Sequence, residues 1–185
     1  MPLAAMLAAV PAAAQRHEFT LVPEQSFVQF EVLHFGTSTT RGRFGPLQGQ
    51  ASLDRSVGRG DVSLRIATAG ISTGIPVFDA RLREPDLLAS QDHPEAFFVA
   101  RDFRFNGSQL QQVRGEFTFR GQSRPMALRA LTFSCRTDSA AQREVCGGDF
   151  DTELLRSEFG ATFGLPVIAD RVRLLIQIEA QRPLP

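Results

Sequence analysis

Ser26-Phe-Val-Gln-Phe-Glu-Val-Leu-His34 is a stretch in which apolar and other residues alternate with a period of two. In an extended chain, Val28, Phe30, Val32 and His34 share one face, and the opposite face is mixed. This alternation predicts a β-strand with one buried face.

The same pattern recurs along the chain and predicts seven further strands. It is clearest over residues 61–68, 113–121, 125–132 and 172–180, and weaker over 47–53, 97–105 and 149–155. Eight antiparallel strands that each bury one face must close into a barrel or stack as a sandwich. Residues 76–88 are the one segment with helical character, because Pro76 can start a helix and Pro85 interrupts it. With no repeat, linker or low-complexity tract, residues 15–185 are expected to form a single domain, all-β apart from that segment.

The composition excludes several classes of function. Twenty basic residues balance twenty acidic ones, so we expect no nucleic-acid partner. The basic residues are all arginine, which indicates codon bias, and the lack of lysine excludes Schiff-base and P-loop lysine chemistry. Tyrosine and tryptophan are absent too, which leaves 16 phenylalanines without a polar group. This indicates a very apolar interior, or an apolar ligand inside it.

The first residues resemble a secretory leader. An apolar run from Met1 to Val10 is followed by Ala12-Ala13-Ala14, which fits a signal peptide over residues 1–14 with cleavage after Ala14. The basic start of such leaders is missing, as in a leader truncated at its start. A disordered or helical extension is the alternative. The leader predicts export and a soluble mature protein.

The chain has two cysteines, Cys135 and Cys146, on either side of a polar segment. An even count in an exported chain predicts one disulfide, here at the base of a loop. Two buried thiols are the alternative.

Several motifs, taken in order, resemble the YceI-like family. They are the stretch from Ser26 to Gly36, Ile71-Ser-Thr-Gly74, Asp79-Ala-Arg-Leu82, Gly115-Glu-Phe-Thr-Phe-Arg-Gly121 and Arg156-Ser-Glu-Phe-Gly160. The similarity runs through nearly all of the chain after the leader. The chain departs from the family where Gln25 replaces a frequent histidine and Phe19 a tyrosine. The segment between the cysteines lies outside the common pattern, so it could alter one mouth of a barrel.

The resemblance implies an extended, lipocalin-like antiparallel barrel exported to the periplasm. It implies a carrier that sequesters a polyisoprenoid or a prenyl quinone, without covalent chemistry or cofactor. A transient partner at the inner membrane would suit such a carrier, and the oligomeric state stays open, a dimer included. The residues expected to face the ligand are Val28, Phe30, Val32, His34, Leu64, Ile66, Phe98, Ala100, Phe117, Phe119, Met126 and Leu128. Because none is fully charged, a long neutral chain is expected rather than a fatty acid.

Two other functions stay open at this point. One is a small-molecule isomerase or hydrolase with His34 as acid and base, which would need a second titratable group nearby. The other is a structural or interaction barrel with a filled core, since apolar strand faces look alike in both. We expect no metal site, because the three histidines lack zinc-ligand spacing. We expect no enzyme, because no catalytic motif occurs. His34 is expected near polar atoms such as those of Arg156.

Overall fold

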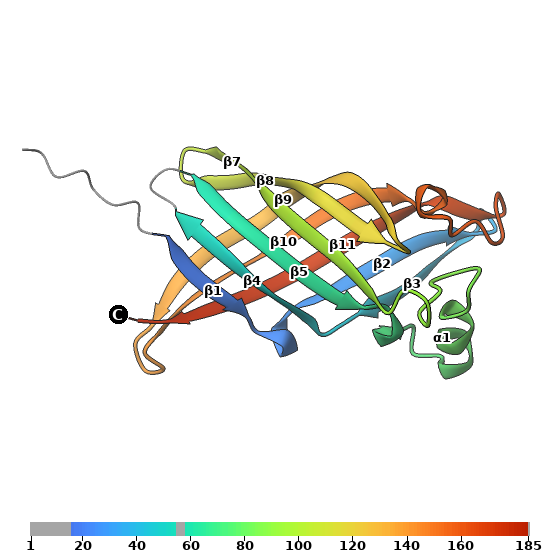
Figure 1. Ribbon diagram of the computed structural model, residues 1–185, viewed down its shortest axis with the longest axis horizontal. Coiled ribbons are helices and arrows are strands. Elements are labelled where there is room, and N and C mark those ends of the chain that lie inside the picture. Colours follow the sequence, from blue (N-terminus) through green and yellow to red (C-terminus); the bar gives the residue numbers. More distant parts are fainter. Residues whose placement is uncertain (1–15, 55–57, 185) are drawn as a thin grey trace, which may run out of the picture.

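The computed structural model describes residues 16–54 and 58–184, which fold into a closed antiparallel β-barrel (Figure 1). The leader predicted over residues 1–14 lies outside the described residues. The ring closes where Thr20 and Leu21 of the first strand pair with Gln181 and Ala180 of the last. The eight-stranded antiparallel barrel expected from the sequence is therefore confirmed. Its strands, in ring order, are β1 (His17–Leu21), β4 (Leu47–Asp54), β5 (Arg59–Ala67), β7 (Glu95–Asn106), β8 (Gln109–Phe119), β9 (Gln122–Asp138), β10 (Arg143–Leu155) and β11 (Ile168–Pro183).

Three of the eight strands are broken, and their second pieces extend one end of the barrel. β2 (Phe27–His34) pairs with β11 beyond the β1 pairing, so β1 and β2 act as one interrupted strand. In the same way β3 (Ser38–Phe44) continues β4, and the short β6 (Ile71–Ser72) continues β5. The breaks are a 3-10 turn η1 (Pro23–Gln25), the Gly45-Pro46 pair and a 3-10 turn η2 (Thr68–Gly70).

The sequence did not predict β1, β3 or β6. β3 reads Ser-Thr-Thr-Arg-Gly-Arg-Phe, with a single apolar side chain, so hydrophobic alternation gives almost no signal there. It forms because its backbone pairs with β2 along its whole length.

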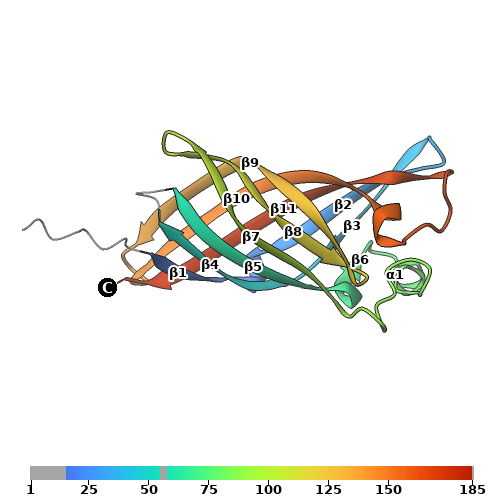
Figure 2. The same cartoon turned by 45° about the horizontal axis from the view of Figure 1, so that its top comes forward.

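α1 (Pro76–Leu82) is shorter than the helical segment expected over residues 76–88. It ends before Pro85, and turns follow as far as the start of β7, because proline disfavours helical geometry in the residue before it. α1 lies at one end of the barrel with the 3-10 turn η3 (Arg156–Phe159) and the loop that leads to β11 (Figure 2). Within the described residues, no helix has the length and hydrophobicity needed to cross a bilayer.

The end of the barrel remote from α1 is filled by side chains. β1, the end of β4, the β7–β8 hairpin and the start of β10 lie towards this end (Figure 1). Together with neighbouring strand residues they supply a close-packed core, whose members are at most 7% exposed: Phe19, Leu53, Ala100, Leu110, Val113 and Phe150.

The predicted disulfide between Cys135 and Cys146 is confirmed, but its setting differs from the prediction. The two residues face each other on β9 and β10, with an S–S distance of 2.04 Å. They do not tie the base of a loop, because β9 continues to Asp138 and β10 starts at Arg143. The polar residues between the cysteines suit the exposed end of a hairpin as well as they suit a loop, so composition alone could not distinguish the two.

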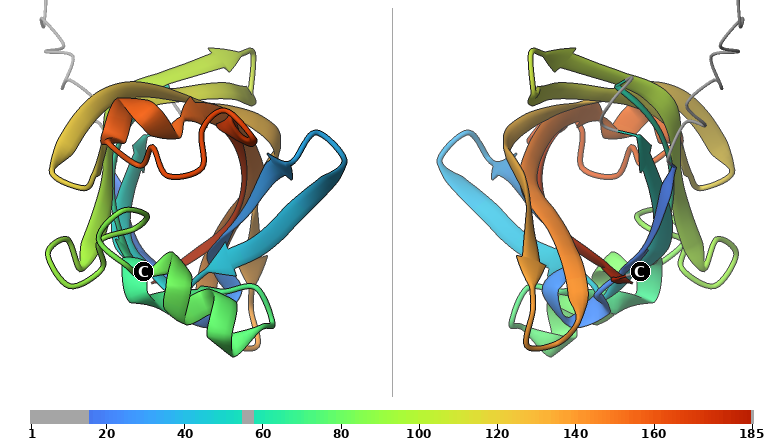
Figure 3. Two further views of the ribbon diagram at one scale, coloured as in Figure 1. Left: turned by 90° about the vertical axis from the view of Figure 1, so that its right-hand side faces the viewer. Right: turned by 90° about the vertical axis from the view of Figure 1, so that its left-hand side faces the viewer.

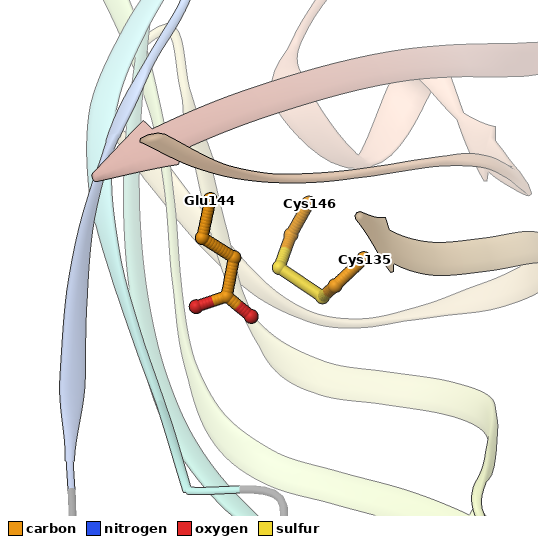
Figure 4. Close-up of side chains that lie close together, drawn as sticks. All are labelled: Cys135, Glu144 and Cys146. Atoms are coloured by element: carbon orange, nitrogen blue, oxygen red, sulfur yellow. A yellow bond between two sulfur atoms is a disulfide. The ribbon is translucent and has the colours of Figure 1, made fainter. Parts of the chain in front are cut away.

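Glu144 lies beside the disulfide (Figure 4). Potential metal-ligand atoms of Cys135, Glu144 and Cys146 lie within 4.8 Å of one another. The sulfurs are bonded to each other, however, and the Glu144 carboxylate accepts a 2.7 Å hydrogen bond from Arg182. The disulfide is therefore a structural link between β9 and β10 at the filled end of the barrel, remote from α1.

Candidate functional site

The end of the barrel near α1 is hollow. It encloses a cavity of about 340 Å³, lined by residues of the barrel wall, α1, the turns after α1 and the loop before β11. This volume lies at the lower end of the range typical of small-molecule sites, roughly 300–1,000 Å³. The mouth lies beside the loop before β11, because Phe163 both lines the cavity and is 47% exposed.

Eleven of the twelve residues expected to face a ligand line this cavity, and Ala100 does not. Ala100 does point into the barrel, but it is packed in the filled half, next to Gly115. Its expected place on the cavity wall is wrong, because alternation identifies the inward face of a strand but not how far along the barrel the hollow extends. The part that the other eleven play in binding stays a prediction. They are Val28, Phe30, Val32, His34, Leu64, Ile66, Phe98, Phe117, Phe119, Met126 and Leu128.

Sequence reasoning did not assign the rest of the lining to the ligand site, including the apolar face of the strand expected over residues 172–180. Two features could have indicated it: the strong alternation of residues 172–180, and the apolar pair Leu87-Leu88 after a proline. The additional apolar lining residues include Phe44, Phe78, Leu82, Leu87, Leu88, Ala161, Phe163, Val172, Leu174 and Ile176.

Aromatic side chains pack along the wall of the hollow. Phe117 and Phe119 of β8 lie against Phe159 of η3, with ring centroids 5.5 and 5.8 Å from it. On the other side, the Phe30 ring lies across Gly42 of β3, where an added Cβ would come within 2.6 Å of the ring. A glycine at that position is therefore needed to admit the Phe30 ring.

Polar side chains of the lining are confined to the end near the mouth. Of all the lining residues, His34, Thr40, Arg81 and Arg156 carry polar side chains. They lie on the final part of β2, on β3, on α1 and on η3, which meet at the hollow end (Figure 3). The inner part of the cavity is apolar, so the site has a polarity gradient from its mouth to its depth.

Arg156 holds the loop that forms one side of the mouth. Its guanidinium donates to four main-chain carbonyls, those of residues 161, 163, 168 and 169, over 2.5–2.9 Å. Burial lowers the pKa of Arg156, which is 8% exposed. His34 was expected near polar atoms such as those of Arg156. The Arg156 guanidinium is engaged by these carbonyls, and the His34 ring lies edge-on to Phe35, with centroids 4.3 Å apart. Arg156 is therefore a clamp for the 161–169 loop.

Further bonds fix α1 and the turns after it. Asp79 accepts bonds of 2.7 and 2.6 Å from the amide and hydroxyl of Thr73, and the hydroxyl bond holds the pKa of Asp79 below its usual value. Arg83 donates to the carbonyls of residues 69 and 71, and Arg120 to those of residues 85, 87 and 159. Arginine side chains thus brace the mouth from three sides, a role that reading them as codon bias overlooked.

Arg81 adds a second guanidinium to the lining. It forms a two-pronged ion pair with Asp86, with both N–O distances 2.7 Å, and lies over the ring of Phe163 at 4.4 Å. The expected set of inward residues carries no full charge, but Arg81 and Arg156 place two charges at the mouth.

The chemistry available to the cavity is limited. Within the described residues, its lining holds the imidazole of His34 and two guanidiniums, and no carboxylate or thiol. The second titratable partner that an acid–base mechanism at His34 would use is therefore not among the described lining residues. The arrangement is suited to enclosing an apolar molecule that has a polar end.

Comparison with known proteins gives a consistent result. The family profile described as YceI-like domain matches residues 19–180. A UPF0312 protein of Pseudomonas aeruginosa is 25% identical over 179 residues, which cover 96% of this chain and 93% of the relative. A UPF0312 protein of Shewanella denitrificans is 28% identical over 153 residues, 82% of this chain and 80% of the relative.

Solved structures of low sequence identity share the fold. BcnA of Burkholderia cenocepacia superposes with a TM-score of 0.72 at 18% identity, over 86% of this chain and 98% of BcnA. A polyisoprenoid binding domain from Saccharophagus degradans gives 0.64 at 17% identity, over 89% of this chain and 98% of that domain. Since the family profile spans most of the chain, this protein belongs to the YceI-like family.

Proposed function

We propose that this protein is a periplasmic carrier for a polyisoprenoid lipid or a prenyl quinone, with the tail in the hollow and the head group at the mouth. The observation that carries the proposal is the polarity gradient of the cavity. Its depth is lined by phenylalanine and aliphatic side chains, and its polar side chains, His34, Thr40, Arg81 and Arg156, lie near the mouth.

The energetics of such a site favour the binding of a hydrocarbon chain. Burying one CH₂ group contributes about 0.8 kcal/mol, so a five-carbon isoprene unit contributes about 3–4 kcal/mol before the cost of ordering it. A few units would give useful affinity without a charged partner. A guanidinium has five N–H donors and Asp86 accepts from two of those of Arg81, so a head group with acceptor oxygens, such as a quinone, could accept from the others.

Two other findings support this function. The Saccharophagus degradans domain of the same fold is named for polyisoprenoid binding. The disulfide suits an oxidising compartment such as the periplasm, where the predicted leader would direct the chain. The mechanism is sequestration, and it needs no cofactor.

Mass spectrometry of lipids extracted from the purified protein tests the proposal. We expect a prenyl lipid at close to one per protein. His34→Phe should keep the fold and a prenyl hydrocarbon ligand but lose the preference for a prenyl quinone over that hydrocarbon, because the imidazole lies at the mouth. Extracts free of prenyl lipid, together with no binding of added prenyl quinone, would refute the carrier.

A further inference from the structure

Large apolar side chains are exposed around the mouth of the cavity. They lie on three segments, which we call the mouth rim. These are the end of β2 with the β2–β3 turn (residues 33–37), the residues before α1 with its first turn (residues 74–78), and the loop before β11 with the first residue of that strand (residues 161–168). The other exposed large apolar residues of the described chain lie on the outer wall, as a pair on β7 and singly on β9 and at the end of β10. The exposed large apolar residues of the mouth rim are Leu33, Phe35, Ile75, Val77, Phe163 and Val167.

The three segments of the mouth rim are tied together. The amide of Phe35 donates a 2.8 Å hydrogen bond to the carbonyl of Val167, which joins the β2–β3 turn to the loop before β11. Arg81 of α1 lies over Phe163 of that loop. An end-on view shows the segments spaced around the hollow end of the barrel (Figure 3).

The mouth rim carries no Asp, Glu or Arg, although charged residues make up 22% of the chain. It is continuous with the cavity, because His34, Phe78, Phe163 and Ile168 belong to the rim and also line the hollow. An apolar ligand that leaves through the mouth therefore passes the few polar side chains of the lining and then meets the exposed apolar side chains of the rim.

We propose that the mouth rim docks onto a lipid bilayer, with its apolar tips inserted, so that a lipid passes between bilayer and cavity without crossing water. The proposal rests on the carrier function. An uncharged rim is complementary to the uncharged interior of a bilayer, and charges of both signs begin directly behind it, with Asp79, Arg81, Arg83 and Glu84 on and after α1. Because these charges offset one another, insertion rather than attraction to anionic lipid drives docking.

Flotation of the full chain with vesicles of pure phosphatidylcholine tests the proposal. We expect the wild type to float with the vesicles, to a similar extent at low and high salt. Val77→Asp should lower the partition coefficient by about tenfold or more, because a carboxylate at an inserted position must leave water. The variant is expected to fold, since Val77 is 78% exposed and an acidic residue is favourable in the first turn of a helix.

Val99→Asp is the matched control, because Val99 is also exposed, at 46%, but lies on the outer wall of β7 away from the rim. It should float like the wild type. The docking proposal is overturned if the wild type does not float, if both variants lose flotation equally, or if Val77→Asp instead dissociates an oligomer, which would make the rim an interface between copies.

Binding of a short-chain, water-soluble prenyl quinone without vesicles separates docking from the carrier function. Val77→Asp should bind it like the wild type. Flotation of a wild type that binds no prenyl quinone would support docking and refute the carrier. Quinone binding by a wild type that does not float would support the carrier and refute docking.

Discussion

Ala96 and Ala100 offer a direct test of where the barrel is hollow. Both lie on the inward face of β7, four residues apart, and both are buried, at 4% and 2% exposed. Ala96 lines the cavity, and Ala100 packs in the filled half against Gly115 of β8. Replacing each by leucine therefore places the same added bulk in two different surroundings.

The expected stabilities differ because only one site has free volume. Deleting a leucine side chain can leave a cavity of about 150 Å³, so a leucine at position 96 fits within the 340 Å³ hollow. We expect Ala96→Leu to lower the free energy of unfolding by less than about 0.5 kcal/mol, because the added side chain does not overpack its surroundings. A Cβ added at Gly115 would lie only 2.5 Å from the Ala100 Cβ, so Ala100→Leu must overpack. That costs about 1–3 kcal/mol, or a fall in Tm of roughly 3–10 °C.

Ligand binding should show the opposite order. If the added leucine displaces three carbons of a prenyl tail, the loss is about 2.4 kcal/mol, or roughly fiftyfold in Kd. Ala100→Leu should bind normally wherever it is folded. Differential scanning calorimetry and isothermal titration with a prenyl quinone measure the two effects, and neither relies on tyrosine or tryptophan fluorescence. An Ala96→Leu variant as unstable as Ala100→Leu, with unchanged affinity, would show that the interior is a packed core.

Two further predictions concern stability away from the cavity. Cys135→Ser should lower the free energy of unfolding by about 2–3 kcal/mol, because the disulfide closes a loop with a sequence separation of 11. Thermal melts should show this loss, and the affinity for a prenyl quinone should stay unchanged because the cavity is remote. The hydrogen bonds from Arg129, aided by Arg173, hold the pKa of Asp151 below its usual value. The ionised carboxylate therefore stabilises the fold fully above about pH 4, and this stabilisation is lost as the pH falls through the lowered pKa. Urea unfolding of Asp151→Asn should therefore approach the wild type at acidic pH, and a constant difference between pH 7 and pH 3 would contradict this.

The sequence predicts the barrel well where apolar alternation is strong. Residues 26–34 and 172–180 show it clearly. All of the second range and all but the first residue of the first range lie in strands of the structure. It fails for β3, whose seven residues include one apolar side chain, because that strand is formed by backbone pairing with β2 rather than by burial of its own side chains. Helix length failed for a different reason, since proline sets where a helix must stop but not how early it does so.

The cavity could be predicted only in part. Strand phase identifies inward positions such as Phe98 and Phe117, and both line the hollow. It cannot separate Ala96 from Ala100, because both share the inward phase and only the tertiary structure shows that the barrel is open at one level and filled at the other. The role of Arg156 as a loop clamp was also beyond reach, since this side chain acts through main-chain carbonyls that sequence patterns do not display.

The three strand breaks lie close together, where the eight-stranded ring joins its extension. At the first break Ser26, fully buried, accepts a bond from the Glu179 amide and donates one to the Glu179 carbonyl, both 3.1 Å, so β11 stays satisfied where β1 gives way to β2. The Ser26 carbonyl also accepts a 3.0 Å bond from the Leu47 amide, just after the second break. An added Cβ on Gly70, in the third break, would lie 2.9 Å from the Gly45 carbonyl, so the second and third breaks are in close contact. The breaks therefore form one belt, and beyond it β2, β3 and β6 extend the wall of the barrel. A serine and two glycines, none of which contributes to hydrophobic alternation, thus hold this belt together, and the cavity reaches past it on β5, where Leu64 and Ile66 precede the third break and line the hollow.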